Sequence, residues 1–176
     1  MLKAVPFTIR RVEVADADAI AAVHVASIRS VGARGYPPEI VNEWGAPRDG
    51  RRYREAMQAG KIYFLAIRGA AVLGFASWRT TEDGQHRIAV YIDGRATRQG
   101  AGTALYRAAE GVAALHGATE IHVDASLAAI DFYLANGFEK QRAGEHPLAS
   151  GARMACVFMQ KRISPPSIEA VAHANS

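Results

Sequence analysis

Three short runs rich in β-branched and aromatic residues follow one another at residues 62–68, 72–80 and 86–92. A Gly69-Ala70 turn separates the first two runs, and the turn Glu82-Asp83-Gly84-Gln85 separates the last two. Connections this short join neighbouring antiparallel strands, so the segment predicts a β-meander. A sheet of this kind needs helices or a second sheet to cover its apolar residues, which restricts the chain to a few architectures.

Predicted helices and further strands flank the meander. Apolar spacing and capping residues predict a helix that begins near Asp16 or Asp18 and ends before Gly32. Further helices are expected from Pro37 or Pro38 to Trp44 and at 51–59, 101–116 and 126–135, and further strands at 7–12, 120–124, 138–142 and 154–161. We therefore predict one α+β domain over residues 1–163, followed by a frayed or docked tail over 164–176.

Composition excludes several classes of protein. The chain has 176 residues and one cysteine, Cys156, so it cannot form an internal disulfide or a cysteine-rich zinc module, and we expect no metal site. No apolar run approaches the ~18 residues of a membrane span, and the first residues lack the apolar stretch of a signal peptide. We expect a cytoplasmic protein without a membrane partner.

The chain carries an excess of positive charge. Lys and Arg number 21 against 17 Asp and Glu, which gives a net charge of +4. Arginine-rich chains favour anionic partners. The arginines are spread along the sequence, however, and no basic cluster is interleaved with aromatic residues, so we expect no nucleic-acid partner.

A glycine-rich junction between the meander and the helix near residue 101 suggests a phosphate site. It reads Arg98-Gln99-Gly100-Ala101-Gly102-Thr103. The first turn of a helix has free backbone N–H groups, and glycines let a pyrophosphate approach them closely. The segment is not a Walker A loop, because no Gly-Lys-Ser/Thr follows, and Leu105 breaks the dinucleotide-binding fingerprint.

Two blocks resemble the GCN5-related N-acetyltransferases, the GNAT superfamily. The segment 89–105 is similar to the strand and (Gln/Arg)-x-x-Gly-x-(Gly/Ala) loop that bind acetyl-CoA in that family, with Thr97 in place of Gln or Arg. The segment 123–138 is similar to the later strand and Ser-x-x-Ala-x-x-Phe-Tyr-x-x-x-Gly-Phe block, with Ala128 where Asn is usual. The blocks occur in the family's order and spacing.

The resemblance implies an acyl-CoA N-acyltransferase fold: a central, mostly antiparallel sheet of about seven strands flanked by about four helices. It implies acetyl-CoA as cosubstrate. The backbone of Tyr91, Ile92 and Asp93 would pair with the pantetheine arm, and an N–H there would polarise the thioester carbonyl. The pyrophosphate would be held by the loop and first helical turn, which comprise Arg98, Gln99, Gly100, Ala101, Gly102 and Thr103.

The same resemblance implies direct attack of a neutral amine on the thioester, so Cys156 needs no role. Tyr133 stands at the family's tyrosine position, where its hydroxyl would protonate the departing thiolate; the alternative is that it only packs with Phe132. The sequence does not identify the general base. His86, Glu82, Asp83 and a water-relayed transfer all stay open.

The acceptor is expected among the first helices and the nearby strand ends. Residues that could line its site are His24, Ser27, Arg29, Tyr36, Trp44 and Trp78. An arginine such as Arg29 or Arg79 would suit a carboxylate on the acceptor. We expect a small-molecule primary amine; the alternatives are a protein or peptide amine, or a CoA-binding module without catalysis. The resemblance also allows a homodimer.

Overall fold

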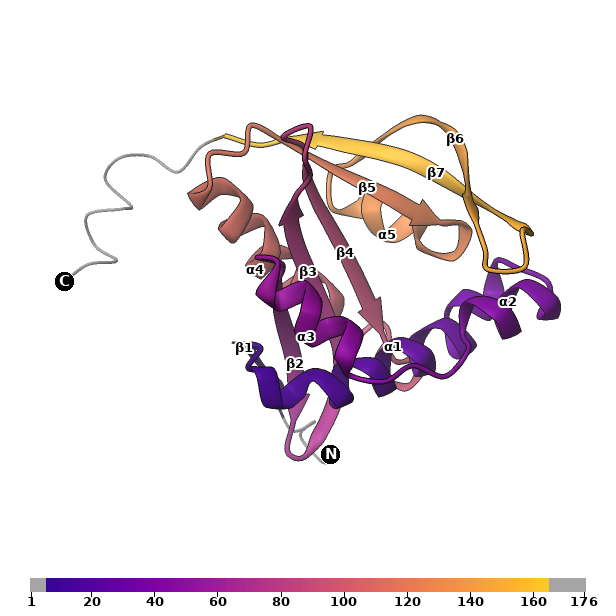
Figure 1. Cartoon of the computed structure of the whole chain (residues 1–176). Helices are drawn as coiled ribbons and strands as arrows, with labels where there is room; N and C mark the ends of the chain where they lie inside the picture. Colours follow the sequence, from indigo (N-terminus) through magenta and orange to yellow (C-terminus); the bar gives the residue numbers. More distant parts are fainter. Residues whose placement is uncertain (1–5, 165–176) are drawn as a thin grey trace.

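The computed structural model describes residues 6–164, and its centre is a sheet in the order β1-β2-β3-β4-β5-β7-β6 (Figure 1). All neighbours pair antiparallel except β4 and β5, which are parallel. The strands are β1 (Thr8–Arg11), β2 (Ile62–Arg68), β3 (Ala71–Thr80), β4 (His86–Ile92), β5 (Glu120–Ser126), β6 (Glu139–Pro147) and β7 (Arg153–Arg162). The predicted meander is β2-β3-β4, joined by the two predicted turns.

Helices cover both faces of the sheet. They are α1 (Ala17–Ser30), α2 (Pro38–Trp44), α3 (Arg51–Gln58), α4 (Ala101–Leu115) and α5 (Ile130–Ala135). Successive side chains of a strand point to opposite faces. Accordingly, Phe75 packs in the cluster of α1 and α3 with Ile20 and Tyr53, while its neighbour Ala76 packs in the cluster of α4 with Leu105.

The sheet opens between its two parallel strands. Their pairing is confined to His86 with Ile121 and Arg87 with His122. β5 pairs with β7 along its whole length, and beyond His122 it leans away from β4, so the two strands diverge (Figure 1). The second half of β4, from Ile88 to Ile92, therefore has a hydrogen-bonded neighbour only on the β3 side. This gap is where a ligand could lie against strand backbone.

The expected mixed α+β fold is confirmed, with two local differences. The predicted strand at 138–142 continues to Pro147, because β6 stays paired with β7 as far as Pro147 with Arg153. The predicted helix at 126–135 is divided into a 3-10 turn, η4 (Leu127–Ala129), and α5. All but the first residue of the predicted 164–176 tail lie outside the described residues.

Candidate active site

The gap between β4 and β5 contains an uncommon contact between a strand N–H and a tyrosine. The N–H of Val90 donates to the hydroxyl of Tyr133, with N and O 3.3 Å apart. Tyr133 lies in α5, is 4% exposed, and packs against Phe132 and Phe138. Burial raises the pKa of its hydroxyl well above the ordinary value, so the group stays protonated at neutral pH. A backbone N–H donor and a protonated phenolic hydroxyl thus meet at one point.

The backbone groups along β4 point alternately toward β3 and toward the gap, which bears on the expected cofactor contacts. The Asp93 N–H donates to the Leu73 carbonyl at 2.8 Å, and Tyr91, two residues earlier, faces β3 in the same way. The backbone groups of Val90 and Ile92 face the gap instead. The side chain of Asp93 stabilises the following turn, because its carboxylate accepts a hydrogen bond from the backbone N–H of Arg95 at 2.9 Å. A ligand paired with β4 would therefore contact Val90 and Ile92.

The glycine-rich junction forms an open helix N-terminus beside the gap. Arg98 and Gly100 have positive φ angles of 61° and 84°, and α4 begins directly after them. The first helical bond runs from the Ala104 N–H to the Gly100 carbonyl, so the N–H groups of Ala101, Gly102 and Thr103 have no partner within the helix. Free N–H groups and the positive end of a helix dipole favour an anion.

Two of the predicted loop residues brace the junction rather than line the gap. The Gln99 amide donates to the Arg95 carbonyl at 3.0 Å, and the methyl group of Ala101 is fully buried in the core. Thr97 donates to the Gly94 carbonyl at 3.0 Å. These contacts hold the loop in the conformation that exposes the N–H groups.

Gly102 stands where α4 approaches α5 and β4 closely. A Cβ at this position would lie 3.1 Å from Cε2 of Phe132 and 3.4 Å from Cγ1 of Ile92. The absence of a side chain therefore keeps the helix N-terminus next to the gap.

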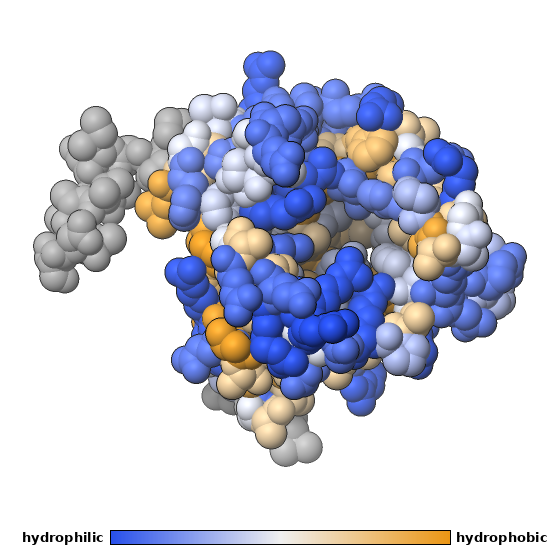
Figure 2. Space-filling model, viewed as in Figure 1, coloured by the Kyte–Doolittle hydropathy of each residue, from blue (hydrophilic) through white to orange (hydrophobic). Residues whose placement is uncertain are grey.

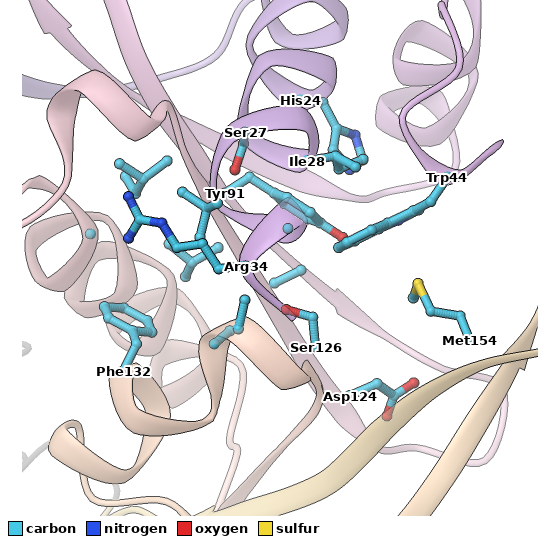
Figure 3. Close-up of a pocket in the computed structure, with 18 of the residues that line it drawn as sticks. His24, Ser27, Ile28, Arg34, Trp44, Tyr91, Asp124, Ser126, Phe132 and Met154 are labelled. Carbon is cyan, nitrogen blue, oxygen red and sulfur yellow. The ribbon is translucent and has the colours of Figure 1, made fainter. Parts of the chain in front are cut away.

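The gap continues into a cavity of about 800 Å³. Figure 2 shows it as a recess rimmed largely by hydrophilic residues, and Figure 3 shows side chains from several elements around it. Seven of the ten predicted site residues line the cavity: Tyr91, Ile92, Arg98, Gly100, Gly102, Thr103 and Tyr133. Asp93, Gln99 and Ala101 do not. Sequence segments far apart in the chain thus meet around one space.

One wall of the cavity is positively charged. Arg48, in the α2–α3 loop, contacts Nδ1 of His24 at 3.0 Å and donates to the Trp44 carbonyl. Within the described residues, no carboxylate lies within ion-pair distance of Arg48. Burial, with the charges of Arg48, Arg52 and Lys61, lowers the pKa of His24 to about 2, so its ring is neutral. The net charge of this wall comes from arginine.

A second wall carries an acidic and a basic side chain in contact. Asp124 of β5 pairs with the guanidinium of Arg87, and its Oδ2 lies 3.3 Å from Nε2 of His146 on β6. Both Asp124 and His146 line the cavity (Asp124 is labelled in Figure 3). No pattern in the sequence indicates this pair, because the two residues are 22 positions apart and meet only through β7.

The arrangement of the chain matches a known family. Residues 33–161, well over half of the sequence, match the profile of the acetyltransferase (GNAT) domain. The chain belongs to the GNAT acetyltransferases. No curated protein is significantly similar to it in sequence.

Solved structures of GNAT proteins share the fold over nearly the whole chain. A GCN5-related N-acetyltransferase from Rhodopseudomonas palustris is 26% identical, with a TM-score of 0.78 over 93% of this chain and 99% of that one. A phosphinothricin acetyltransferase from Sinorhizobium meliloti, in complex with acetyl-CoA, is 19% identical, with a TM-score of 0.68 over 92% and 94%. The ribosomal-protein-S18-alanine N-acetyltransferase from Escherichia coli is 18% identical, with a TM-score of 0.65 over 93% and 97%.

The base candidates expected for a GNAT acetyltransferase lie elsewhere. His86 is at the start of β4, where its Nδ1 lies 3.3 Å from Nε1 of Trp78. Glu82 and Asp83 occupy the exposed β3–β4 turn, where Asp83 accepts a hydrogen bond from Thr81. None of the three lines the cavity. The β4–β5 pairing at His86 and Arg87 separates them from the gap.

The acceptor residues expected for a GNAT acetyltransferase divide into two groups. His24, Ser27 and Trp44 line the cavity (Figure 3), whereas Arg29, Tyr36 and Trp78 do not. The Arg29 guanidinium donates to the Gly45 carbonyl at 3.0 Å, and the alternative carboxylate partner, Arg79, is an exposed residue of β3 outside the cavity lining. The cavity offers Arg48 instead.

Two other kinds of feature do not occur in residues 6–164. No group of three or more His, Cys, Asp or Glu side chains is placed to hold a metal ion there. The same residues include no helix that is both long and apolar enough to cross a bilayer.

Proposed function

We propose that the protein transfers an acetyl group from acetyl-CoA to a primary amine of a small molecule. The observation that carries this proposal is the divergence of β4 from β5, with a phenolic hydroxyl and a strand N–H meeting in the gap. An open helix N-terminus lies at one end of the same cavity. These are the groups that a thioester and a pyrophosphate require.

Acetyl-CoA would lie along the gap. The N–H groups of Ala101, Gly102 and Thr103, with the side chain of Arg98, would hold the pyrophosphate. Val90 and Ile92 would pair with the pantetheine arm through their backbone. The Val90 N–H would then bond the thioester carbonyl oxygen, where negative charge develops during attack.

Chemistry would proceed by direct attack. The acceptor nitrogen adds to the carbonyl carbon, the new C–N bond forms, and the C–S bond breaks with its electron pair on sulfur. Tyr133, which stays protonated because it is buried, would give its proton to the thiolate. It regains a proton from the nitrogen through solvent, so the hydroxyl is unchanged after each cycle. Cys156 has no part in these steps.

Contacts across the acceptor end favour a small molecule over a peptide. Ser150, in the β6–β7 turn, donates from its N–H and its hydroxyl to the carboxylate of Glu43 on α2, both at 2.6 Å. Tyr36, before α2, donates to the Ala155 carbonyl at 2.6 Å and accepts from the Leu127 N–H at 2.9 Å. These bridges join the two segments that an extended peptide would have to pass between.

The positive wall favours an acceptor that also carries an anionic group. Arg48 is partly buried, lines the cavity and contacts neutral atoms of His24 and Trp44. A carboxylate would supply the charged partner that such a guanidinium otherwise lacks. An amino acid meets both requirements, with an amine to accept the acetyl group and a carboxylate to bind Arg48.

The test has two measurements on the full chain. Calorimetry should show binding of acetyl-CoA, and thiol release should follow the addition of one or more amines from a panel of amino acids, alkylamines and short peptides. Binding without release on any amine would support a non-catalytic module and contradict the proposal. Release on peptides alone would favour the peptide alternative.

A further inference from the structure

The cavity holds several ionisable groups, and most of them cannot accept a proton from an amine near neutral pH. His24 has a pKa of about 2, and burial raises the pKa of Tyr91 to about 12 and that of Tyr133 further. The carboxylate of Glu43 already accepts hydrogen bonds from Ser150, and these lower its pKa. A weak base or a protonated phenol does not take up a proton under these conditions.

Asp124 is also a poor base. Burial alone would raise its pKa, but contacts with His146 and Arg87 outweigh burial and lower it. Its two oxygens are engaged, Oδ1 by the Arg87 guanidinium and Oδ2 by the His146 ring. A carboxylate held by two such partners orients the imidazole and does not itself serve as the proton acceptor.

His146 is therefore the cavity residue best suited to proton transfer. It shares a sheet face with Asp124 because Asp124 pairs with Phe158, Ser126 with Cys156 and His146 with Met154, and paired residues point to the same side. Nε2 lies 3.3 Å from the carboxylate, where it would donate its proton, which leaves Nδ1 as the nitrogen able to take another. Its side chain is 40% exposed, so a ligand in the cavity can reach it.

The pair of Asp124 and His146 lines the same cavity as the expected reaction centre. Val90 and Tyr133, whose contact marks that centre, are part of the same lining. An amine placed between His146 and the Val90–Tyr133 contact would have its proton acceptor on one side and the thioester on the other.

We propose that His146, oriented by Asp124, is the catalytic general base that deprotonates the ammonium group of the acceptor. This inference rests on the proposed acetyl transfer. The acceptor enters as an ammonium ion, one of its N–H protons moves to Nδ1 of His146, and the freed lone pair attacks the carbonyl carbon. His146 later releases that proton to solvent. Asp124 is a positioning residue, because it acts through the ring.

The interpretation of a pH profile for His146 depends on the other ionisable groups near it. They are Asp124 on β5, Arg87 on β4, Cys156 on β7 and the ion pair of Glu145 with Arg153 at 2.5 Å. Burial raises the pKa of the Cys156 thiol, so the thiol stays neutral near pH 7. Asp124, with its lowered pKa, stays ionised there.

The experiment compares His146→Gln with the matched variant His122→Gln. His122 is also a strand histidine beside a carboxylate, 2.9 Å from Glu120, but it lies outside the cavity. With an amine that the unaltered protein acetylates, His146→Gln should lower kcat at pH 7 by about 100-fold. The loss should shrink at high pH, where the amine is deprotonated by solvent. Acetyl-CoA binding should be unchanged, and Asp124→Asn should show a smaller loss with the same pH trend.

A second variant distinguishes loss of the base from loss of the fold. His146→Ala should lose activity and recover part of it when free imidazole is added, because the removed ring leaves room in an accessible cavity. The inference is overturned if His146→Gln keeps a rate within about 3-fold of His122→Gln with the same pH profile. If the unaltered protein transfers acetyl to no amine, the proposed function itself fails, a result separate from the variant comparison.

Discussion

On the proposed cofactor side of the cavity the groups that would face the ligand belong mainly to the backbone, whereas on the proposed acceptor side they belong to side chains. The first side consists of the β4 edge at Val90 and Ile92 and the N-terminus of α4. The second side collects Arg48, Asp124 and His146 from a loop and two strands. A backbone site tolerates varied sequences provided that its glycines and strand pairing remain. A side-chain site changes with each substitution, so we expect this side to determine which acceptor binds.

The largest expected effect tests the backbone side. Gly102→Glu should abolish detectable binding of acetyl-CoA, because its side chain meets Phe132 and Ile92 and places a negative charge at the helix N-terminus. Calorimetry measures the affinity. Gly111→Glu is the matched control, since a Cβ at this position of the same helix would have no other atom within 4 Å, and it should bind normally. Equal binding by both variants would refute the assignment of this helix end.

A smaller loss is expected at the point where the two sides meet. Tyr133→Phe should lower kcat by roughly 10- to 100-fold, because the thiolate loses its proton donor, while acetyl-CoA binding persists. Steady-state kinetics separates the two quantities. Tyr106→Phe makes the same change in a buried tyrosine whose hydroxyl contacts Lys161 at 2.9 Å, outside the cavity, and should leave the rate unchanged. An unaltered rate in Tyr133→Phe would remove it as the acid.

A substitution at Arg48, on the proposed acceptor side, should affect only amines that carry a carboxylate. Arg48→Met is expected to raise KM for amino acids by about 10-fold while leaving KM for alkylamines without a carboxylate unchanged. Arg107→Met, in an α4 arginine that does not line the cavity, serves as the control. Parallel changes for both classes of amine in Arg48→Met would contradict a carboxylate contact.

The smallest effect concerns the turn that follows β4, which the carboxylate of Asp93 stabilises. Hydrogen bonds from Arg95 lower the pKa of Asp93, so its carboxylate stabilises the fold above the ordinary aspartate pKa and loses this contribution as pH falls. Asp93→Asn should cost about 1 kcal/mol at neutral pH and flatten the decline of Tm below about pH 5. Thermal unfolding of this variant beside Glu82→Gln, an exposed turn residue, measures the difference. An undiminished acid decline in Asp93→Asn would show that Asp93 is not responsible.

The same contrast explains what the sequence could predict. The meander, the α4 junction and Tyr133 follow from local patterns of β-branched residues, glycines and a family block. The structure places the end of the meander's last strand, the α4 junction and Tyr133 around one cavity. The register of β4 relative to β3 is not encoded locally, so the sequence could not show that the backbone groups of Val90 and Ile92 face the gap while those of Tyr91 and Asp93 face β3.

The residues proposed to contact the acceptor were harder to predict, because they are brought together by strand pairing between distant parts of the chain. His146 reaches Asp124 only after β7 inserts between β5 and β6, an order that no local pattern records. Tyr36 resembles a ligand-contacting aromatic in sequence, yet it does not line the cavity, and its hydroxyl joins Ala155 to Leu127. His86 is on the expected strand but at the end where that strand is still paired with β5.

The structure of the protein with acetyl-CoA bound tests the central claim most directly. We predict the pantetheine arm between β4 and β5, the pyrophosphate on the N-terminus of α4, and the thioester oxygen within hydrogen-bonding distance of the Val90 N–H with Tyr133 beside the sulfur. Acetyl-CoA bound elsewhere, or a closed gap with Val90 still bonded to Tyr133, would contradict the account.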